Sequence, residues 1–283
     1  MKITALMDNL AAENKAVTAE HGLSLFFEGD GFRVLFDSGQ SALTMQNAES
    51  LGIDLRKVDT VVLSHSHYDH ARGLRHMLDA GLAGHRLIVG EHFFEKKYAG
   101  TGDEASDLSC GFDREYLKEK GIEVLTCSDC LEVAPGLWAV GNFPRVNAFE
   151  IIPARFTKAP GTFSADGRPV LVPDDFSDEI CLAAETPDGL CVFVGCSHPG
   201  IVNIIRHVHK RLGKQVIGVY GGTHLKDADD ARIYRTVRLL KEMGLKTIGF
   251  SHCSGTRAEE IAAEDPDVTS CHLAAGEVLV LPD

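Results

Sequence analysis

The sequence lacks any run of 18 or more apolar residues, the length that a helix needs to cross a lipid bilayer. We therefore expect no membrane-spanning helix. Basic residues are also scarce: 28 lysines and arginines stand against 41 aspartates and glutamates, and the formal net charge is −13. An acidic balance disfavours non-specific binding to nucleic acid or to an anionic membrane, and we expect neither as a partner. An anionic small-molecule substrate is still allowed, because bound metal ions can reverse the local field.

Features of exported proteins are missing as well. The opening residues reach Asp8 and Asn9 before the apolar core of a leader could form, so we expect a cytoplasmic protein. The eight cysteines are scattered, and thiols in that compartment stay reduced. Cys127 and Cys130 form a single CxxC pair. A structural zinc site needs a second pair of ligands, so we expect this pair to be structural or incidental.

What is present indicates an α/β protein. The 283 residues, 44% of them hydrophobic, can bury a substantial core, and we expect a single domain over residues 1–283. Short apolar runs alternate with longer helical patterns, which is typical of α/β folds. We predict strands at 23–27, 32–36, 58–63, 190–195, 216–220, 247–250 and 278–281, and helices at 41–51, 200–212, 228–243 and 257–264. Residues 96–173 hold most of the prolines, which predicts loops and edge hairpins there.

Histidines follow the ends of four predicted strands. They stand in the segments 64–70, 195–198, 221–224 and 251–252. In open α/β sheets, sites form where the carboxyl ends of such strands meet. The pattern therefore predicts one histidine-rich site at a sheet edge.

The first of these segments has the spacing of a metal site. His65 and His67 lie two residues apart, so they face the same way in an extended segment. Asp69 and His70 follow as the chain turns, which lets them address a second point nearby. Imidazole and carboxylate together suit zinc, iron or manganese better than calcium or magnesium.

At these residues the sequence resembles the metallo-β-lactamase superfamily, and the resemblance runs over almost the whole chain. The HxHxDH motif stands at residues 65–70, and Asp37 matches an aspartate that precedes it in the superfamily. The resemblance implies an αββα four-layer sandwich of the α/β (α+β) class with two divalent metal ions, zinc first, with manganese or iron as alternatives. It implies a first metal held by His65, His67 and His198, and a second held by Asp69, His70 and His252.

One place departs from the superfamily pattern. Members usually supply a metal-bridging aspartate after the third motif, and here His224 occupies the matching place. His224 is interpreted as a ligand, a proton donor or an orienting group. We predict Asp69 and His224 as the catalytic residues: Asp69 orients the nucleophile, and His224 stabilises an oxyanion or protonates a leaving group. Asp37 is expected to hold a ligand histidine in its tautomer.

A narrower resemblance concerns the phrases HGLS, LFDSGQ, SHSHYDH, GCSHPGIVN and GGTHL, which begin at residues 21, 35, 64, 195 and 221. They are similar to a group commonly labelled as dihydropterin ribofuranosylaminobenzene phosphate synthase, a pterin-linked transferase. Where that group commonly reads His-Thr-Gly-Gly-Leu, this chain has Arg72 in the third position. Arg72 and Arg145 are candidate contacts for an anionic substrate, and so is the helix N-terminus after His198.

The leading hypothesis is a metal-dependent hydrolase that uses a metal-activated water on a small phosphorylated or ester-type metabolite. The alternatives are the pterin-linked transferase and a non-catalytic metal or ligand sensor. A di-iron redox protein is disfavoured, because redox members usually carry glutamate where this chain has His67. His21 is expected to approach the site, and His207 and His209 to be structural or exposed. The acidic residues Asp174, Asp175, Asp178 and Glu179 are expected to form a solvated turn.

Overall fold

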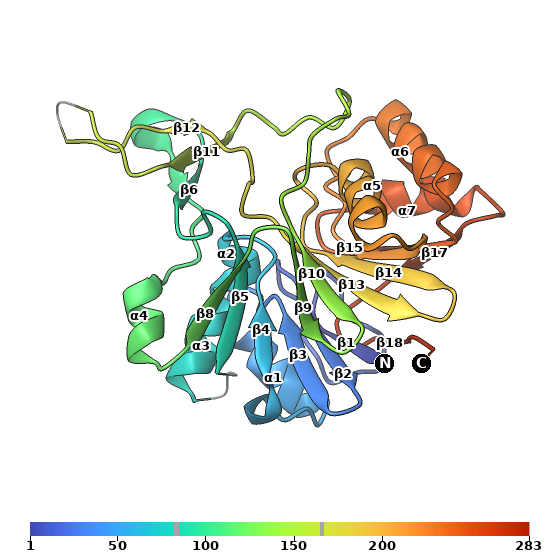
Figure 1. Cartoon of the computed structure of the whole chain (residues 1–283), viewed down its shortest axis with the longest axis horizontal. Coiled ribbons are helices and arrows are strands. Elements are labelled where there is room, and N and C mark those ends of the chain that lie inside the picture. Colours follow the sequence, from blue (N-terminus) through green and yellow to red (C-terminus); the bar gives the residue numbers. More distant parts are fainter. Residues whose placement is uncertain (82–84, 165–166, 283) are drawn as a thin grey trace.

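The computed structural model describes residues 1–81, 85–164 and 167–282, and its strands form two seven-stranded sheets and one four-stranded sheet (Figure 1). The first large sheet has the strand order β18-β1-β2-β3-β4-β5-β8. Its strands are β1 (Lys2–Met7), β2 (Ser24–Gly29), β3 (Phe32–Phe36), β4 (Thr60–Val62), β5 (Arg86–Gly90), β8 (Glu123–Cys127) and β18 (Val278–Val280). Strands β2 and β3 form the predicted hairpin, and β3, β4, β5 and β8 are parallel neighbours.

The second large sheet has the order β17-β16-β15-β14-β13-β10-β9. Its strands are β9 (Cys130–Ala134), β10 (Leu137–Val140), β13 (Cys181–Thr186), β14 (Gly189–Val194), β15 (Val216–Gly221), β16 (Thr247–Phe250) and β17 (Thr269–His272). Strands β14 to β17 are parallel neighbours, as the first sheet's β3, β4, β5 and β8 are. Both sheets therefore bring the carboxyl ends of several parallel strands to one edge.

The helices cover the outer faces of the two large sheets. Those on the first sheet are α1 (Leu43–Ser50), α2 (Tyr68–Ala71), α3 (Gly73–Asp79) and α4 (Arg114–Glu119), with the short 3-10 helices η1 (Leu55–Lys57) and η2 (Gly102–Glu104) nearby in sequence. Those on the second sheet are α5 (Ile201–Leu212), α6 (Asp230–Glu242) and α7 (Thr256–Ala263). Among the described residues, no helix is long and apolar enough to cross a membrane.

Three buried clusters show how these layers are held together. One lies between the two sheets and includes Phe27 of β2 and Phe193 of β14, whose rings meet edge to face at 4.8 Å. The other two lie outside the sheets, under α1 to α4 and under α5 to α7. In α5 the apolar residues recur at helical spacing, and all of them are buried except Leu212, which is partly buried, so this face packs on the sheet. The order helix, sheet, sheet, helix confirms the αββα sandwich.

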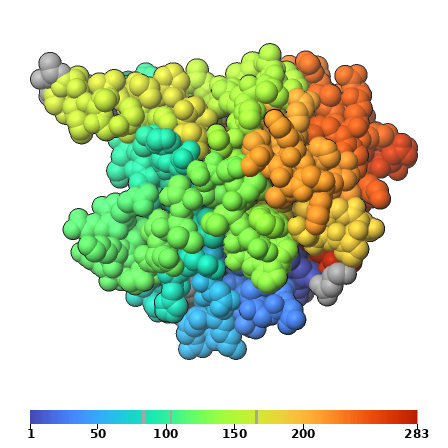
Figure 2. Space-filling model, in the orientation of Figure 1, coloured from blue at the N-terminus to red at the C-terminus, as the bar shows by residue number. Residues whose placement is uncertain are grey.

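The middle of the chain is more regular than the sequence predicts. Strand β8 extends the first sheet, the hairpin of β9 and β10 closes the edge of the second, and α4 was not expected. The four-stranded sheet, in the order β12-β11-β6-β7, consists of β6 (Lys96–Ala99), β7 (Ser106–Asp107), β11 (Phe156–Ala159) and β12 (Val172–Pro173). It stands out from the sandwich at the upper left (Figures 1 and 2). Strands of two to four residues are too short to show a period of two in the sequence.

Candidate metal centre

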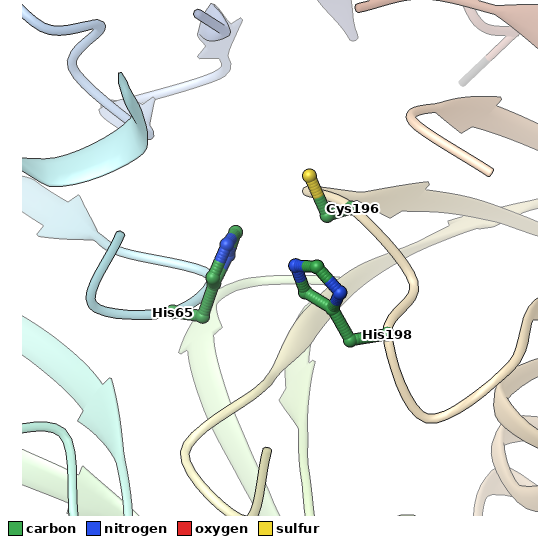
Figure 3. A group of neighbouring side chains, drawn as sticks. All are labelled: His65, Cys196 and His198. Carbon is green, nitrogen blue, oxygen red and sulfur yellow. The ribbon is translucent and has the colours of Figure 1, made fainter. Parts of the chain in front are cut away.

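Three buried side chains from two strand-end loops face one another at the junction of the sheets. His65 follows β4, and Cys196 and His198 follow β14 (Figure 3). Their ligand atoms all lie within 4.8 Å of one another. Nε2 of His65 and both ring nitrogens of His198 have no hydrogen-bond partner. Because buried polar atoms are normally paired, unpaired imidazole nitrogens that converge in this way fit a metal ion.

His67 borders this first group. Its ring centroid lies 4.7 Å from that of His65 and 5.1 Å from that of His198, and its Nε2 is also buried without a partner. Burial lowers the pKa of His67 to about 3 and holds the pKa values of His65 and His198 well below the ordinary value. These three imidazoles are therefore neutral, which is the form that binds metal.

A second group of ligand atoms adjoins the first. His70, Cys196 and His252 also have their ligand atoms within 4.8 Å of one another. Nε2 of His70 lies 3.2 Å from Nε2 of His252 and 3.2 Å from Sγ of Cys196. Around a tetrahedral zinc ion, two imidazole nitrogens are about 3.3 Å apart and a nitrogen and a thiolate sulfur about 3.6 Å. The observed spacing is close to both values.

Asp69 connects the second group to the solvent side. Its Oδ2 lies 3.2 Å from Nε2 of His252 and 3.1 Å from Nε2 of His21, which is half-exposed. Burial would raise the pKa of Asp69, but His70, His21 and His252 together hold it well below the usual range. Asp69 is thus a carboxylate, as a metal ligand must be. His21 approaches the site as the sequence suggested, because the segment before β2 runs past Asp69.

A set of hydrogen bonds orients the histidines from behind. Asp37 accepts from the Ser64 backbone N–H at 2.7 Å and lies 2.7 Å from Nδ1 of His70. The Ser64 hydroxyl donates to Asp37 at 2.8 Å and lies 3.0 Å from Nδ1 of His65. In the same way Nδ1 of His252 lies 3.0 Å from Oδ1 of Asn9. In His65, His70 and His252, Nδ1 is thus engaged by a neighbouring side chain, which leaves Nε2 directed at the metal position.

The backbone at the site is strained where it turns these side chains inward. Asp37, Ser197, His224 and His252 all have positive φ, between 50° and 61°. Non-glycine residues rarely adopt this conformation, and such residues cluster at functional sites. Gly195 permits the close approach of the two sheets, because a Cβ there would lie 2.1 Å from the Ser64 hydroxyl.

The acidic turn before β13 is buried, so the expectation of a solvated turn is wrong for three of its four residues. Asp174, Asp178 and Glu179 are at most 4% exposed, and only Asp175 is exposed. The ammonium of Lys97, itself 1% exposed, lies 2.9 Å from a carboxylate oxygen of Asp174 and 2.9 Å from one of Asp178. The sequence missed this cluster because Lys97 lies on the short β6, far from the turn along the chain.

This buried cluster reaches the metal-binding loop. Asp178 accepts hydrogen bonds from the backbone N–H and from the hydroxyl of Ser66, both at 2.9 Å. Glu179 accepts from the backbone N–H of His198 at 3.0 Å, and burial raises its pKa well above the usual range. Phe176 stacks on the His198 ring at 3.7 Å. The turn thus supports the loops after β4 and β14 from one side.

A pocket of about 300 Å³ opens directly over the histidines. His67, His198 and His252 lie in its wall, together with His224. The His224 ring lies 4.5 Å from that of His198, and burial lowers its pKa to about 4. His224 therefore faces the pocket, whereas the ligand atom shared by both groups is the sulfur of Cys196.

The cations of the pocket are not the ones that the sequence singled out. Arg155 and Lys226 line the pocket. Arg72 instead donates to the Ser109 carbonyl at 3.3 Å and lies over the Tyr68 ring, and the exposed Arg145 donates to the Glu150 carbonyl at 3.2 Å. Arg155 carried no signal in the sequence, because it lies in the irregular middle of the chain, and Lys226, although it follows His224 by two residues, was not singled out.

The helix N-terminus after His198 is also not available to an anionic substrate. The Glu150 carboxylate accepts from the backbone N–H groups of Val202 and Asn203 at 2.9 and 3.1 Å. A carboxylate of the chain itself therefore occupies the position proposed for a phosphate.

Comparisons with known proteins agree with this geometry. A sequence profile of the metallo-β-lactamase superfamily matches residues 17–126. The 7,8-dihydropterin-6-methyl-4-(β-D-ribofuranosyl)-aminobenzene-5'-phosphate synthase of Methanocaldococcus jannaschii is 32% identical, over 99% of this chain and 96% of that protein. A solved structure described as a metal-dependent hydrolase of the β-lactamase superfamily is 28% identical with full coverage of both chains and a TM-score of 0.83. The fold also matches the metallo-β-lactamase fold protein YhfI from Bacillus subtilis, with a TM-score of 0.56, 13% identity and 98% coverage of each chain.

Proposed function

The chain belongs to the metallo-β-lactamase superfamily, and from that premise we propose that it is a metal-dependent hydrolase acting on a small phosphorylated or ester-type metabolite through a metal-activated water. The observation that carries the proposal is the set of buried imidazole nitrogens without partners at the base of a pocket. We propose that the chain binds two divalent metal ions and that zinc is the preferred metal. His65, His67 and His198 hold the first ion, and Asp69, His70 and His252 hold the second. Manganese and iron are the alternatives.

The residues around the pocket divide the chemical work. Divalent metal ions there would supply Lewis acidity and lower the pKa of a water molecule toward neutrality. Asp69 is positioned to orient the attacking water, because its carboxylate faces the pocket between His21 and His252. His224 is positioned to hydrogen-bond the oxygen on which negative charge develops, because its ring faces the same space beside His198.

The wall of the pocket supports an anionic substrate. Arg155 and Lys226 are positively charged in a protein of negative net charge. Both side chains are exposed and line the pocket. Asp227 neutralises Arg155 only weakly, with 3.4 Å between the guanidinium and carboxylate oxygen. A phosphate or carboxylate group that reaches the histidines would meet both cations.

We propose further that the chain acts as a single domain over residues 1–283 in the cytoplasm, with small molecules as partners and neither nucleic acid nor membrane. The eight free cysteines suit a reducing compartment, and the net charge of −13 opposes binding to polyanions.

A transferase acting on pterin compounds is the second candidate, and one observation favours it. The relative from Methanocaldococcus jannaschii, similar over nearly all of both chains, is named as a synthase of a phosphorylated pterin compound. A phosphate group is common to both candidates, so the cations of the pocket do not separate them. The acceptor of the transferred group separates them, because a hydrolase uses water and a transferase uses a second substrate.

The test follows that difference. The zinc-loaded protein is incubated with a panel of phosphoesters and esters in ¹⁸O-labelled water, and the products are analysed by mass spectrometry. A hydrolase incorporates one ¹⁸O atom per turnover without a second substrate. Asp69→Asn is the inactive variant, and Asp59→Asn, an exposed aspartate beside β3, is the matched control that keeps activity.

Two results would overturn the hydrolase proposal. One is turnover that needs a pterin-type co-substrate and leaves ¹⁸O out of the product, which establishes the transferase. The other is the absence of turnover with the whole panel despite bound metal, which favours the non-catalytic sensor.

A further inference from the structure

The sulfur of Cys196 has a position that no other thiol in the described part of the chain shares. Cys196 is buried and follows β14 directly after Gly195. It is the one residue that belongs both to the group with His65 and His198 and to the group with His70 and His252. Figure 3 shows the sulfur above the gap between the His65 and His198 rings.

We propose that Cys196 is a metal ligand shared by the two groups of histidines and that its thiolate joins the two metal positions. The inference rests on the proposed metal-dependent function and deepens it. It assigns the shared ligand to a sulfur atom rather than to His224, whose ring lies in the pocket wall and belongs to neither group. On binding metal, the thiol gives its single proton to solvent, so the first metal to bind Cys196 releases one proton from this sulfur and the second releases none from it.

Cys196 contacts the side chain of Cys253, and its other contacts are those of a metal ligand. Other buried thiols, such as Cys127 and Cys110, lie against backbone carbonyl oxygens at 3.5 and 3.2 Å. Sγ of Cys196 instead lies 3.2 Å from Nε2 of His70, a nitrogen whose partner atom Nδ1 is already held by Asp37. The sulfur therefore faces ligand nitrogens on both sides.

The backbone around Cys196 is fixed, as a preorganised ligand requires. Gly222 donates its N–H to the Gly195 carbonyl at 3.0 Å, and the Ser197 hydroxyl donates to the Gly222 carbonyl at 2.7 Å. A Cβ on Gly222 would lie 2.3 Å from the Gly195 carbonyl oxygen, so only glycine permits this packing of the β15 end on the β14 end. The backbone that carries the sulfur is thus fixed by contacts that need no metal.

A thiolate among imidazoles narrows the choice of metal. Soft sulfur with borderline nitrogen ligands selects zinc or iron in preference to magnesium, calcium and manganese. The proposal therefore predicts zinc or iron in the native protein and a weak response to added manganese.

Cobalt(II) in the zinc position tests the proposal by absorption spectroscopy. The metal is removed from the full chain with a chelator, Co²⁺ is added, and the spectrum and metal content are recorded. A thiolate ligand gives an intense sulfur-to-cobalt charge-transfer band in the near ultraviolet. Wild type is expected to show the band, and Cys196→Ser to lose it while it keeps the visible bands of histidine-bound cobalt. Cys196→Asp should bind cobalt without the band, which shows that the site still folds.

Cys253 provides the matched control. Its sulfur lies 3.7 Å from the Cys196 carbonyl and in the pocket wall, but it belongs to neither group of ligand atoms. Cys253→Ser is expected to retain the full charge-transfer band. Cobalt bound without a band in wild type, or a band that Cys253→Ser removes and Cys196→Ser keeps, would overturn the assignment of Cys196 while the metal site stands. No cobalt binding at all would overturn the proposed function together with it.

Discussion

Oδ2 of Asp37 lies 2.7 Å from Nδ1 of His70, and both side chains are fully buried. A carboxylate in this place accepts the Nδ1 proton and leaves the Nε2 lone pair free for a metal ion. The same carboxylate holds the Ser64 hydroxyl, which in turn contacts His65. Asp37 thus acts on one histidine from each group of ligands.

The first prediction concerns Asp37→Asn. An amide NH₂ group in place of Oδ2 donates to His70 Nδ1, which moves the ring proton to Nε2 and blocks ligation. We expect metal affinity to fall about 10- to 100-fold, measured by competition with a chelator. Asp59→Asn, on the exposed surface, should leave the affinity unchanged. An unaltered affinity in Asp37→Asn would show that His70 does not bind through Nε2.

The strand-end histidines could be predicted from the sequence because each follows a short buried run. His65, His198, His224 and His252 all come to the same edge of the sandwich, since β4 lies between parallel strands and β14, β15 and β16 are parallel to one another. Parallel strands all point the same way, so the residues that follow their carboxyl ends lie at one edge of the sheet. The four-layer sandwich was predicted from the resemblance to the metallo-β-lactamase superfamily, because the strand pattern alone indicates only an α/β protein.

The residues of the buried acidic cluster could not be predicted, because their contacts span long stretches of chain. Lys97 meets Asp178 across 81 residues, and Asp178 meets Ser66 across 112 residues. Nothing local distinguishes a buried aspartate from a solvated one in an acidic turn. Cys196 was read as one scattered cysteine among eight, because its role depends on the distance between two sheets.

The second prediction concerns the buried cluster around Lys97. Lys97→Met removes the cation and leaves two buried carboxylates, Asp174 and Asp178, without a positive charge to pair with. We expect the free energy of unfolding to fall by about 3–5 kcal/mol, measured by urea denaturation. Because Asp178 holds Ser66 in the metal-binding loop, zinc affinity should fall as well.

Lys214→Met is the matched control for the same change at the surface. Lys214 is exposed and its partner Glu185 is partly exposed, and ion pairs at the surface contribute little to stability. The urea midpoint of Lys214→Met should therefore stay close to that of wild type. Equal midpoints for both variants would mean that the Lys97 cluster does not hold the fold together.

The third prediction separates two arginines as substrate contacts. Arg155 lines the pocket, whereas Arg145 donates to the Glu150 carbonyl away from it. Arg155→Gln should raise KM for an anionic substrate about 10-fold, the equivalent of one charge-assisted hydrogen bond, with unchanged metal content. Arg145→Gln should leave KM unchanged. The reverse order of effects in steady-state kinetics would place the anion at Arg145 and contradict the assignment from the pocket.

The fourth prediction uses the carboxylate that caps α5. Glu150 accepts from the N–H groups of Val202 and Asn203, so Glu150→Ala should lower the free energy of unfolding by about 1–3 kcal/mol. Burial raises the pKa of Glu150 above its usual value. Because the pKa of Glu150 is higher in the folded state than in the unfolded state, protonation of this residue favours folding. This stabilisation is fully present at a pH below the unfolded-state pKa and is lost as the pH rises through the folded-state pKa.

Glu150→Gln tests the sign of that dependence, because its amide cannot ionise. The variant should gain stability relative to wild type between pH 4.5 and pH 7.5, a window chosen to begin at about the usual pKa of glutamate. Urea denaturation at both pH values measures the difference, and Glu119→Gln on the exposed face of α4 controls for the substitution itself. If wild type instead becomes more stable relative to Glu150→Gln as the pH rises, the backbone N–H donors of α5, which favour the carboxylate, outweigh the burial of Glu150. In that case Glu150 would be ionised at the N-terminus of α5. This carboxylate would then occupy the anion-binding position of the helix over the whole pH range of the measurement.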